Sequence, residues 1–293
     1  MPTPDDLIPT PDDLMPTGWL SRFERFDVVG STNDVVAGWL REGTPEVCAA
    51  VADVQSAGRG RNGRTWAAPP GAGVLISLGF RPTWLEVGHT WRLGAIVSLA
   101  MADAAETAAG LRAGTVRLKW PNDLVAIDRR TGDVRKLGGM LGETDGLATD
   151  DARAVIGLGI NVDWAPERFP ADLAESMTSL TDLSGRTVDR EVVLRVFLER
   201  LEPAVAALRA GRFPAAAWTD RQLTNGTIVM LEQPDGTSET VVAEDVDTES
   251  GALLVRDPGR HSGPTGDGQR RSVLVGEIHH LRLGGPDASK AGV

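Results

Sequence analysis

Cysteine, lysine and long apolar runs are scarce or missing in this 293-residue chain. The single cysteine, Cys48, excludes an internal disulfide and is typical of a reducing compartment. It lies in the apolar run 47–54, so we expect a buried, unreactive thiol rather than a nucleophile. No apolar run approaches the roughly 18 residues that cross a membrane. Because the acidic N-terminus also has no apolar signal core, we expect no membrane association, no export and a cytoplasmic location.

Motifs for several chemistries are also missing. The histidines show no metal-ligand spacing except the adjacent pair His279 and His280, whose side chains should point to opposite sides of a strand. The chain has no Gly-x-Ser-x-Gly nucleophile elbow and no P-loop ending in Gly-Lys-Ser/Thr. Residues 58–63 fit Gly-x-Gly-x-x-Gly, but no convincing βαβ helix follows, so the dinucleotide signal is weak. The remaining polar motifs offer no side-chain nucleophile.

Positive charge is in the minority. The formal net charge is −11, and attraction to phosphates dominates nucleic-acid affinity, so a general nucleic-acid binder is disfavoured. Of the 30 basic residues, only those at 119, 136 and 290 are lysines. In a chain that otherwise uses arginine, a lysine can mark a place that needs a compact ammonium group. Lys119 and Lys136 lie in motifs described below, which suggests such a need.

The most distinctive stretch covers residues 55–66 and reads Gln-Ser-Ala-Gly-Arg-Gly-Arg-Asn-Gly-Arg-Thr-Trp. Its glycines allow positive φ and a close approach of a ligand to the main chain. Its arginines offer planar, permanently charged groups that bind phosphate or carboxylate at two points. In an acidic chain, this pattern indicates a loop that binds a small anion rather than a patch that binds DNA.

Periodicity and turn signals predict an α+β fold. The strands that we expect before residue 180 cover 26–29, 47–54, 73–80, 116–120, 124–127, 136–143 and 154–160, with a hairpin loop at 128–135. Helices are expected after Ser31 or Thr32, over 91–109 with a cap at Gly110, and over 191–210. Pro203 is expected to kink or split the last helix. The result is a mixed β-sheet domain flanked by helices.

The chain changes character after Trp218. The β-like runs that follow cover 227–232, 240–246, 252–256 and 272–283, with a Gly- and Pro-rich loop at 261–269, and they predict a small antiparallel barrel. A proline- and acid-rich repeat marks residues 1–17 as a disordered tail. The expected divisions are this tail, a catalytic domain at 18–222, the β domain at 223–284 and a flexible tail at 285–293.

Three further motifs contain polar or small residues that could belong to a ligand site. Ser31-Thr32-Asn33 suits a helix N-cap, or a ligand site at a helix N-terminus. Asn122-Asp123 is a turn pair, or a site where Asp123 helps to hold Mg²⁺ between nucleotide phosphates. The strands at 136–143 and 157–162 contain glycines, which indicates that something lies close to their backbone. Such a set suits a reaction driven by positioning and electrostatic stabilisation.

In order and spacing, these motifs resemble biotin protein ligase, the biotin–acetyl-CoA-carboxylase ligase family. The resemblance rests on Ser31-Thr32-Asn33, Gln55 through Trp66, Lys119-Trp120-Pro121-Asn122-Asp123, Lys136 through Glu143 and Gly157 through Val162. It covers roughly residues 18–222, and the C-terminal segment matches the family's SH3-like β-barrel more loosely. The family joins biotin to ATP, which gives biotinyl-5′-AMP and pyrophosphate. It then transfers biotin to one lysine of a biotin carboxyl carrier protein.

The resemblance implies a role for each matching residue. The implied biotin-site residues are Ser31, Thr32, Asn33, Gln55, Arg59, Gly60, Arg61, Lys136, Gly138 and Gly139. The implied ATP-site residues are Arg59, Arg61, Arg64, Trp66, Asn122, Lys136 and Asn161, with Trp66 and Asn161 at the adenine. The implied catalytic residues are Arg61, Lys136, Lys119 and Asp123, and Asp123 is also the candidate ligand for Mg²⁺. Because the carboxylate of biotin attacks an α-phosphate, fixed cations must offset the repulsion between two anions.

The resemblance leaves alternatives open. Many family members carry an N-terminal helix-turn-helix, which residues 1–17 are too short to form, so we expect a ligase that does not bind DNA. A lipoate or other acyl ligase of the same superfamily is the nearest alternative, and a non-catalytic small-molecule or nucleic-acid binding module is the second. A monomer and a homodimer are both compatible with the sequence. The loop 58–65 is expected to be disordered without ligand and ordered over biotinyl-AMP.

Overall fold

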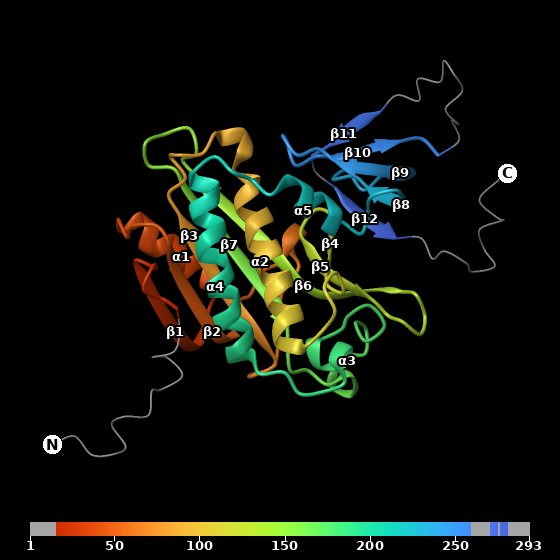
Figure 1. Cartoon of the computed structure of the whole chain (residues 1–293), viewed down its shortest axis with the longest axis horizontal. Coiled ribbons are helices and arrows are strands. Elements are labelled where there is room, and N and C mark those ends of the chain that lie inside the picture. Colours follow the sequence, from red (N-terminus) through yellow and green to blue (C-terminus); the bar gives the residue numbers. More distant parts are fainter. Residues whose placement is uncertain (1–15, 259–269, 275, 281–293) are drawn as a thin grey trace.

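The computed structural model describes residues 16–258, 270–274 and 276–280, which form a large β-sheet with helices and a second, smaller sheet (Figure 1). Most of the expected N-terminal tail, the expected C-terminal tail and the loop 261–269 lie outside the described residues. Within the described part of the chain, no helix is long and apolar enough to span a membrane.

The large sheet is mixed and has seven strands in the order β1-β2-β3-β7-β6-β5-β4. Its strands are β1 (Arg22–Val29), β2 (Cys48–Gln55), β3 (Gly73–Phe80), β4 (Arg117–Lys119), β5 (Asp123–Ile127), β6 (Val134–Asp145) and β7 (Arg153–Asn161). The pair β1–β2 is parallel, with a crossover through helix α1 (Thr32–Arg41), and the other neighbours are antiparallel. The predicted α+β class with a mixed sheet is confirmed.

Helices pack on both faces of the large sheet because its central strands are apolar on both faces. In β2, Ala49 and Val51 belong to the main core, which includes α2 (Trp91–Ala109) and α4 (Arg190–Arg209). The alternate residues Cys48 and Ala50 pack with α1 on the other side. Figure 1 shows α2 and α4 side by side across the sheet. The short helices α3 (Leu180–Ser184) and α5 (Ala215–Arg221) were not predicted.

Helix boundaries follow the local sequence. Helix α2 ends at Gly110, which takes the left-handed conformation with φ 63° that glycine adopts without strain. Helix α4 begins after Asp189, whose side chain accepts a hydrogen bond from the Glu191 amide. It continues through Pro203 as one element, so a split helix is wrong. Apolar residues before and after the proline, such as Phe197 and Val205, are buried in the same core and hold the helix together.

The small sheet is antiparallel, in the order β11-β10-β9-β8-β12. Its strands are β8 (Thr227–Glu232), β9 (Ser238–Val246), β10 (Leu253–Arg256), β11 (Arg271–Val273) and β12 (Glu277–His280). The run expected at 272–283 is therefore two strands, which pair at opposite edges of the described sheet. Closure into an SH3-like barrel and the domain boundaries at 222 and 284 stay predictions.

Cys48 offers a direct test of the core around α1. Its side chain is fully buried, and burial raises the pKa of its thiol to about 11. We therefore expect no reaction of the native protein with a thiol reagent such as 5,5′-dithiobis(2-nitrobenzoate) at pH 8, and reaction of the single cysteine after denaturation. Rapid labelling of the native protein, followed by absorbance, would show that this part of the core is open.

Candidate functional site

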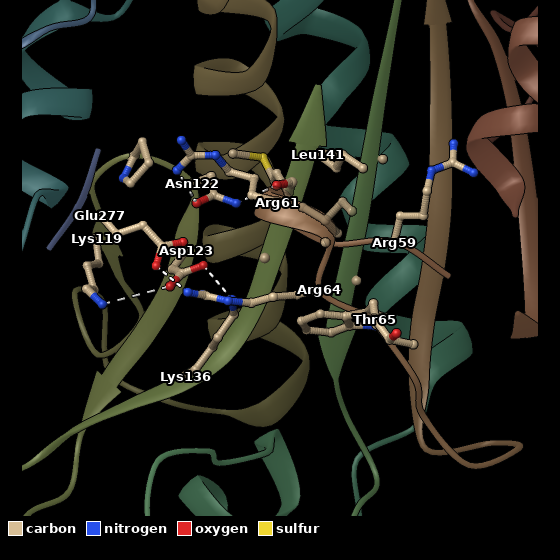
Figure 2. Close-up of a pocket in the computed structure, with 18 of the residues that line it drawn as sticks. Arg59, Arg61, Arg64, Thr65, Lys119, Asn122, Asp123, Lys136, Leu141 and Glu277 are labelled. Atoms are coloured by element: carbon tan, nitrogen blue, oxygen red, sulfur yellow. Dashed lines mark hydrogen bonds and ion pairs between the residues drawn. The ribbon is translucent and has the colours of Figure 1, made fainter. Parts of the chain in front are cut away.

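A cavity of about 300 Å³ lies on the face of the large sheet opposite α2 and α4 (Figure 2). Its walls come from the start of α1, the loop after β2, the β4–β5 turn, β6, β7 and strand β12 of the small sheet. The predicted site residues that line it are Ser31, Thr32, Asn33, Gln55, Arg59, Gly60, Arg61, Arg64, Trp66, Lys119, Asn122, Asp123, Lys136 and Gly139. Motifs spread over more than 100 residues of sequence thus meet in one cavity.

Two of the predicted residues do not line the cavity. Gly138 packs toward the neighbouring strand, where an added Cβ would lie 2.7 Å from the carbonyl oxygen of Gly159. Asn161 is buried at the end of β7, and its amide donates to the carbonyl of Thr178 at 3.0 Å. Its implied contact with adenine stays a prediction.

One end of the cavity is neutral and rich in hydrogen-bonding groups. The Thr32 amide and hydroxyl donate to Gln55 Oε1 at 2.8 and 3.0 Å. Ser77 donates to Asn33 Oδ1 at 2.6 Å, and the Asn33 amide donates to Glu143 Oε2 at 2.6 Å. Thr32 and Asn33 are almost fully buried, so this network fixes their side chains. Ser31 is the N-cap of α1 by position, but its side chain makes no capping hydrogen bond.

Glycines of β7 make room for this network. Residues 154, 156, 158 and 160 face the main core, and Gly157 and Gly159 alternate with them on the cavity side. A Cβ at Gly157 would lie 2.1 Å from Asn33 Oδ1, and a Cβ at Gly159 would lie 2.5 Å from the Trp66 ring. The predicted close approach to this strand is confirmed, and the approaching groups are the side chains of Asn33 and Trp66.

The other end of the cavity is cationic. Lys136 Nζ lies 2.6 Å from one oxygen of Asp123, and Lys119 Nζ lies 4.0 Å from the other (Figure 2). Lys136 Nζ also lies 5.6 Å from the centre of the Trp66 ring, within the range of a cation–π contact. Burial lowers the pKa of Lys119, and the nearby Asp123 opposes this effect. Two ammonium groups thus share one carboxylate, which leaves excess positive charge for an anionic ligand.

Asp123 does not fit the predicted role of a magnesium ligand. Mg²⁺ prefers one or two free carboxylates together with phosphate oxygens and water. Here the carboxylate lies between two ammonium groups, which would repel a cation bound at the same place. Within the described ranges, the group with several candidate metal ligands is instead Glu232, Glu277 and His279, whose ligand atoms lie within 4.8 Å of one another. Glu232 and Glu277 are half-buried, and His279 is exposed.

The loop after β2 brings its arginines to different partners. Its centre is the one-turn 3₁₀ helix η2 (Arg61–Gly63), in which Asn62 and Gly63 take positive φ of 55° and 72°. Arg61 contacts Asn122 Oδ1 at 3.5 Å and the carbonyl of Gly276 at 3.4 Å. Arg64 forms an ion pair with Glu277, a residue of β12. The cavity is therefore closed on one side by contacts between the loop and the small sheet.

Arg59 has a different environment. Its guanidinium binds both oxygens of Asp34 on α1, at 2.8 and 2.7 Å, and lies 3.2 Å from Glu143. The hydrogen bond from Arg59 holds the pKa of Asp34 below its ordinary value. In Figure 2, Arg59 points away from the group formed by Lys119, Asp123 and Lys136. It fixes the beginning of the loop to α1, and its implied contact with the biotinyl carboxyl group stays a prediction.

Sequence reasoning missed three residues: Glu277, which lines the cavity, and Ser77 and Glu143, which hold side chains that line it. Ser77 is the one hydroxyl in the otherwise apolar β3, a signal that could have drawn attention to it. Glu143 ends a recognised motif, but its two partners, Asn33 and Arg59, were not assigned to it. Glu277 carries no local signal, because it reaches the cavity from the small sheet.

Comparison with known proteins agrees with the geometry. Residues 26–161 match the biotin/lipoate A/B protein ligase family. The chain is 33% identical over 271 residues to the biotin–acetyl-CoA-carboxylase ligase of Mycobacterium tuberculosis, which covers 91% of each protein. It is 35% identical over 172 residues to the bifunctional ligase/repressor BirA of Bacillus subtilis, which covers 59% of this chain and 50% of that protein.

A solved structure has a similar fold. The biotin protein ligase of Aquifex aeolicus, determined in complex with biotin and ATP, superimposes with a TM-score of 0.69 at 24% identity and covers 89% of this chain and 99% of that one. At this identity the likeness supports the fold, and the family follows from the sequence relatives. The chain therefore belongs to the biotin/lipoate A/B protein ligase family, among its biotin–acetyl-CoA-carboxylase ligases.

Proposed function

We propose that this protein activates biotin with ATP to give biotinyl-5′-AMP and pyrophosphate, and then transfers biotin to a lysine of a biotin carboxyl carrier protein. The observation that carries the proposal is one cavity with a neutral, hydrogen-bonding end and a cationic end. Biotin has the matching polarity, since its ureido ring is neutral and its far end is a carboxylate. The named relatives, biotin–acetyl-CoA-carboxylase ligases, support the same activity.

The neutral end suits the ureido ring. Asn33 and Gln55 carry amides and Thr32 carries a hydroxyl, and the network that these residues form with Glu143 and the buried Ser77 fixes their orientation before a ligand binds. A site built this way discriminates strongly against a ligand that leaves its polar groups unpaired. Lipoate has no ureido group, so this end of the cavity favours biotin over lipoate.

The cationic end suits the chemical step. An oxygen of the biotin carboxylate attacks the α-phosphorus, the bond to the bridging oxygen of pyrophosphate breaks, and the electron pair leaves with pyrophosphate. Lys136 and Arg61 would offset the repulsion between the two anions as they meet. In the second step, the neutral amine of the acceptor lysine attacks the biotinyl carbonyl carbon, the bond from this carbon to the AMP phosphate oxygen breaks, and AMP leaves with the electron pair while the amine gives up one proton to solvent. Lys119 would brace Asp123 and keep it near Lys136.

We propose a biotin carboxyl carrier protein as acceptor, a cytoplasmic location in keeping with the single cysteine, and no binding to DNA. A gel-shift assay that finds tight, sequence-specific binding to an operator would contradict the last point. Any Mg²⁺ would enter with the phosphates of ATP, since Asp123 is already paired with lysines.

The decisive experiment measures pyrophosphate release from ATP with biotin, with lipoate and without acid. We expect release that depends on biotin and little release with lipoate. Release with lipoate alone would favour the lipoate ligase, and no release with either acid would favour a binding module. A second assay, mass spectrometry of a carrier protein after incubation, should show the added mass of biotin on one lysine.

The loop 58–65 should change its order on ligand binding. Its backbone makes few hydrogen bonds across the turn, among them Gly60 to Arg64 at 2.7 Å, and most of residues 62–65 is exposed. We expect slower amide hydrogen exchange in this loop with biotinyl-AMP than without ligand, because the contacts that the loop makes without ligand protect it only in part. Equal and slow exchange in both states would show a permanently closed loop and contradict the prediction.

A further inference from the structure

The centre of the arginine loop touches the small sheet at one short segment, residues 276–277. Arg64 forms an ion pair with Glu277, and Asn62 donates to the other oxygen of the same carboxylate at 3.2 Å. The residue before Asn62, Arg61, donates a hydrogen bond to the carbonyl of Gly276 at 3.4 Å. Three polar side chains of the loop therefore contact residues 276–277 at the start of β12, and Figure 2 shows Glu277 directed toward Arg64.

The contact with Glu277 leaves Arg64 able to bind a further anion. Arg64 uses one terminal nitrogen for Glu277, and its remaining guanidinium nitrogens make no hydrogen bond with any residue in the described part of the chain. The Arg64 side chain is 62% exposed, whereas the Glu277 side chain is only 15% exposed. A guanidinium carries five donors, so one carboxylate can orient it while phosphate oxygens bind at its other edge. The less exposed Glu277 is the fixed partner of this pair.

The position of the segment places this contact at the cationic end of the cavity. Glu277 lines the same cavity as Lys119, Asp123 and Lys136, where the phosphates of ATP are expected. The partner of Glu277 in the sheet register is Glu232 of β8, which contacts His279 at 3.2 Å and does not line the cavity. Of these two neighbouring glutamates, only Glu277 contacts the loop.

We propose that Glu277 is a positioning residue for ATP. Through Arg64 and Asn62 it holds the loop in the conformation that binds the triphosphate, so the small sheet sets the ATP affinity of a site built mainly by the large sheet. Ordering these side chains in advance lowers the entropic cost of binding. The inference rests on the proposed function for its ligand, and on the contacts of Glu277 for its mechanism.

The kinetic test compares Glu277→Ala with the matched control Glu232→Ala in the assay of biotin-dependent pyrophosphate release. We expect Glu277→Ala to raise KM for ATP about tenfold, with KM for biotin and kcat changed less than twofold (an estimate for loss of one charge-assisted hydrogen-bonded pair). Glu277→Asp should restore part of the loss, and Glu232→Ala should change none of these values. In the Arg64→Ala background, removal of Glu277 should have little further effect.

Three kinetic results would overturn the proposal. An unchanged KM for ATP would show that the contact does not matter. A lower KM would show that Glu277 competes with phosphate for Arg64. If removal of Glu277 still raised KM for ATP tenfold in the Arg64→Ala background, Glu277 would act through residues other than Arg64.

A second measurement does not depend on catalysis. Amide hydrogen exchange in residues 58–66 should become several times faster in Glu277→Ala and stay unchanged in Glu232→Ala. Unchanged exchange in both variants would overturn the positioning role. If the unaltered protein releases no pyrophosphate with biotin, the proposed function fails, but the exchange comparison still decides whether Glu277 orders the loop.

Discussion

Lys136→Ala is expected to lower kcat/KM for biotin adenylation about a thousandfold, equal to a loss of about 4 kcal/mol of transition-state stabilisation. Lys136 lies within β6, with its ammonium group at the cavity between Asp123 and Trp66. A fixed cation on a strand does not need to reorganise when charge shifts onto the phosphate oxygens, which is why its loss should be costly. Steady-state pyrophosphate release over a range of biotin concentrations at saturating ATP, together with single-turnover adenylate formation, measures the effect.

The control for this variant is Lys136→Arg. It keeps the charge, but a planar guanidinium does not have the compact geometry of an ammonium group, so we expect partial activity. Both variants should keep the fold, because the Lys136 side chain is 38% exposed and lies outside the apolar core. An adenylation rate within a few times normal in Lys136→Ala, with an unchanged melting temperature, would refute the role of this lysine.

Arg61→Ala should also lower kcat/KM for biotin adenylation, but by a smaller factor of about a hundred. Arg61 lies on a loop, so it must be ordered before it can stabilise charge, and part of its binding energy is spent on that ordering. Single-turnover adenylate formation distinguishes the two residues. A loss larger than that of Lys136→Ala would show that the loop, rather than β6, supplies the main stabilising cation.

Gly157→Ala is the second prediction with a large effect, about a hundredfold increase in KM for biotin. The added methyl group would lie 2.1 Å from Asn33 Oδ1 and 2.9 Å from its Cγ. Asn33 is only 4% exposed and is held by Ser77 and Glu143, so it can yield only by breaking those hydrogen bonds. Isothermal titration calorimetry with biotin, and KM from pyrophosphate release, measure the loss.

The matched control is Gly142→Ala in the adjacent strand. An added Cβ there has its nearest neighbour at 3.5 Å, which is an ordinary contact. We expect biotin affinity close to that of the unaltered protein in this variant. If Gly157→Ala also binds biotin normally, then the network around Asn33 does not form the biotin site, and the neutral end of the cavity needs another ligand.

The elements with strong periodicity could be predicted from the sequence almost to the residue. Strand β3 at 73–80 is uniformly apolar, and α2 at 91–109 combines helical spacing with a glycine at its end. Strand β1 was predicted four residues too short, since charged residues such as Arg22 and Glu24 alternate along a partly exposed edge. The helices α3 and α5, of five and seven residues, are too short to show a clear period.

The candidate site could be predicted as a set of residues but not as an arrangement. From the motifs we predicted that Lys136, Asp123 and the arginine loop share one site, and all of them line one cavity. They could not show that Asp123 pairs with both lysines, because a carboxylate before a strand looks the same when it faces a metal or an ammonium group. They also could not show the contact between Arg64 and Glu277, which joins residues 213 positions apart. Such contacts depend on the docking of two sheets.

The glycines of β7 have a consequence for how this enzyme can diverge. At Gly157 and Gly159 no substitution can remove side-chain atoms and every substitution adds them, and an added Cβ would meet the side chain of Asn33 or Trp66. These two positions already leave as much space to the cavity as they can. Variants that accept a bulkier analogue of biotin should therefore arise from side chains that can be shortened, such as Leu141 or Leu173 on other walls. Directed evolution for larger substrates should leave both glycines unchanged.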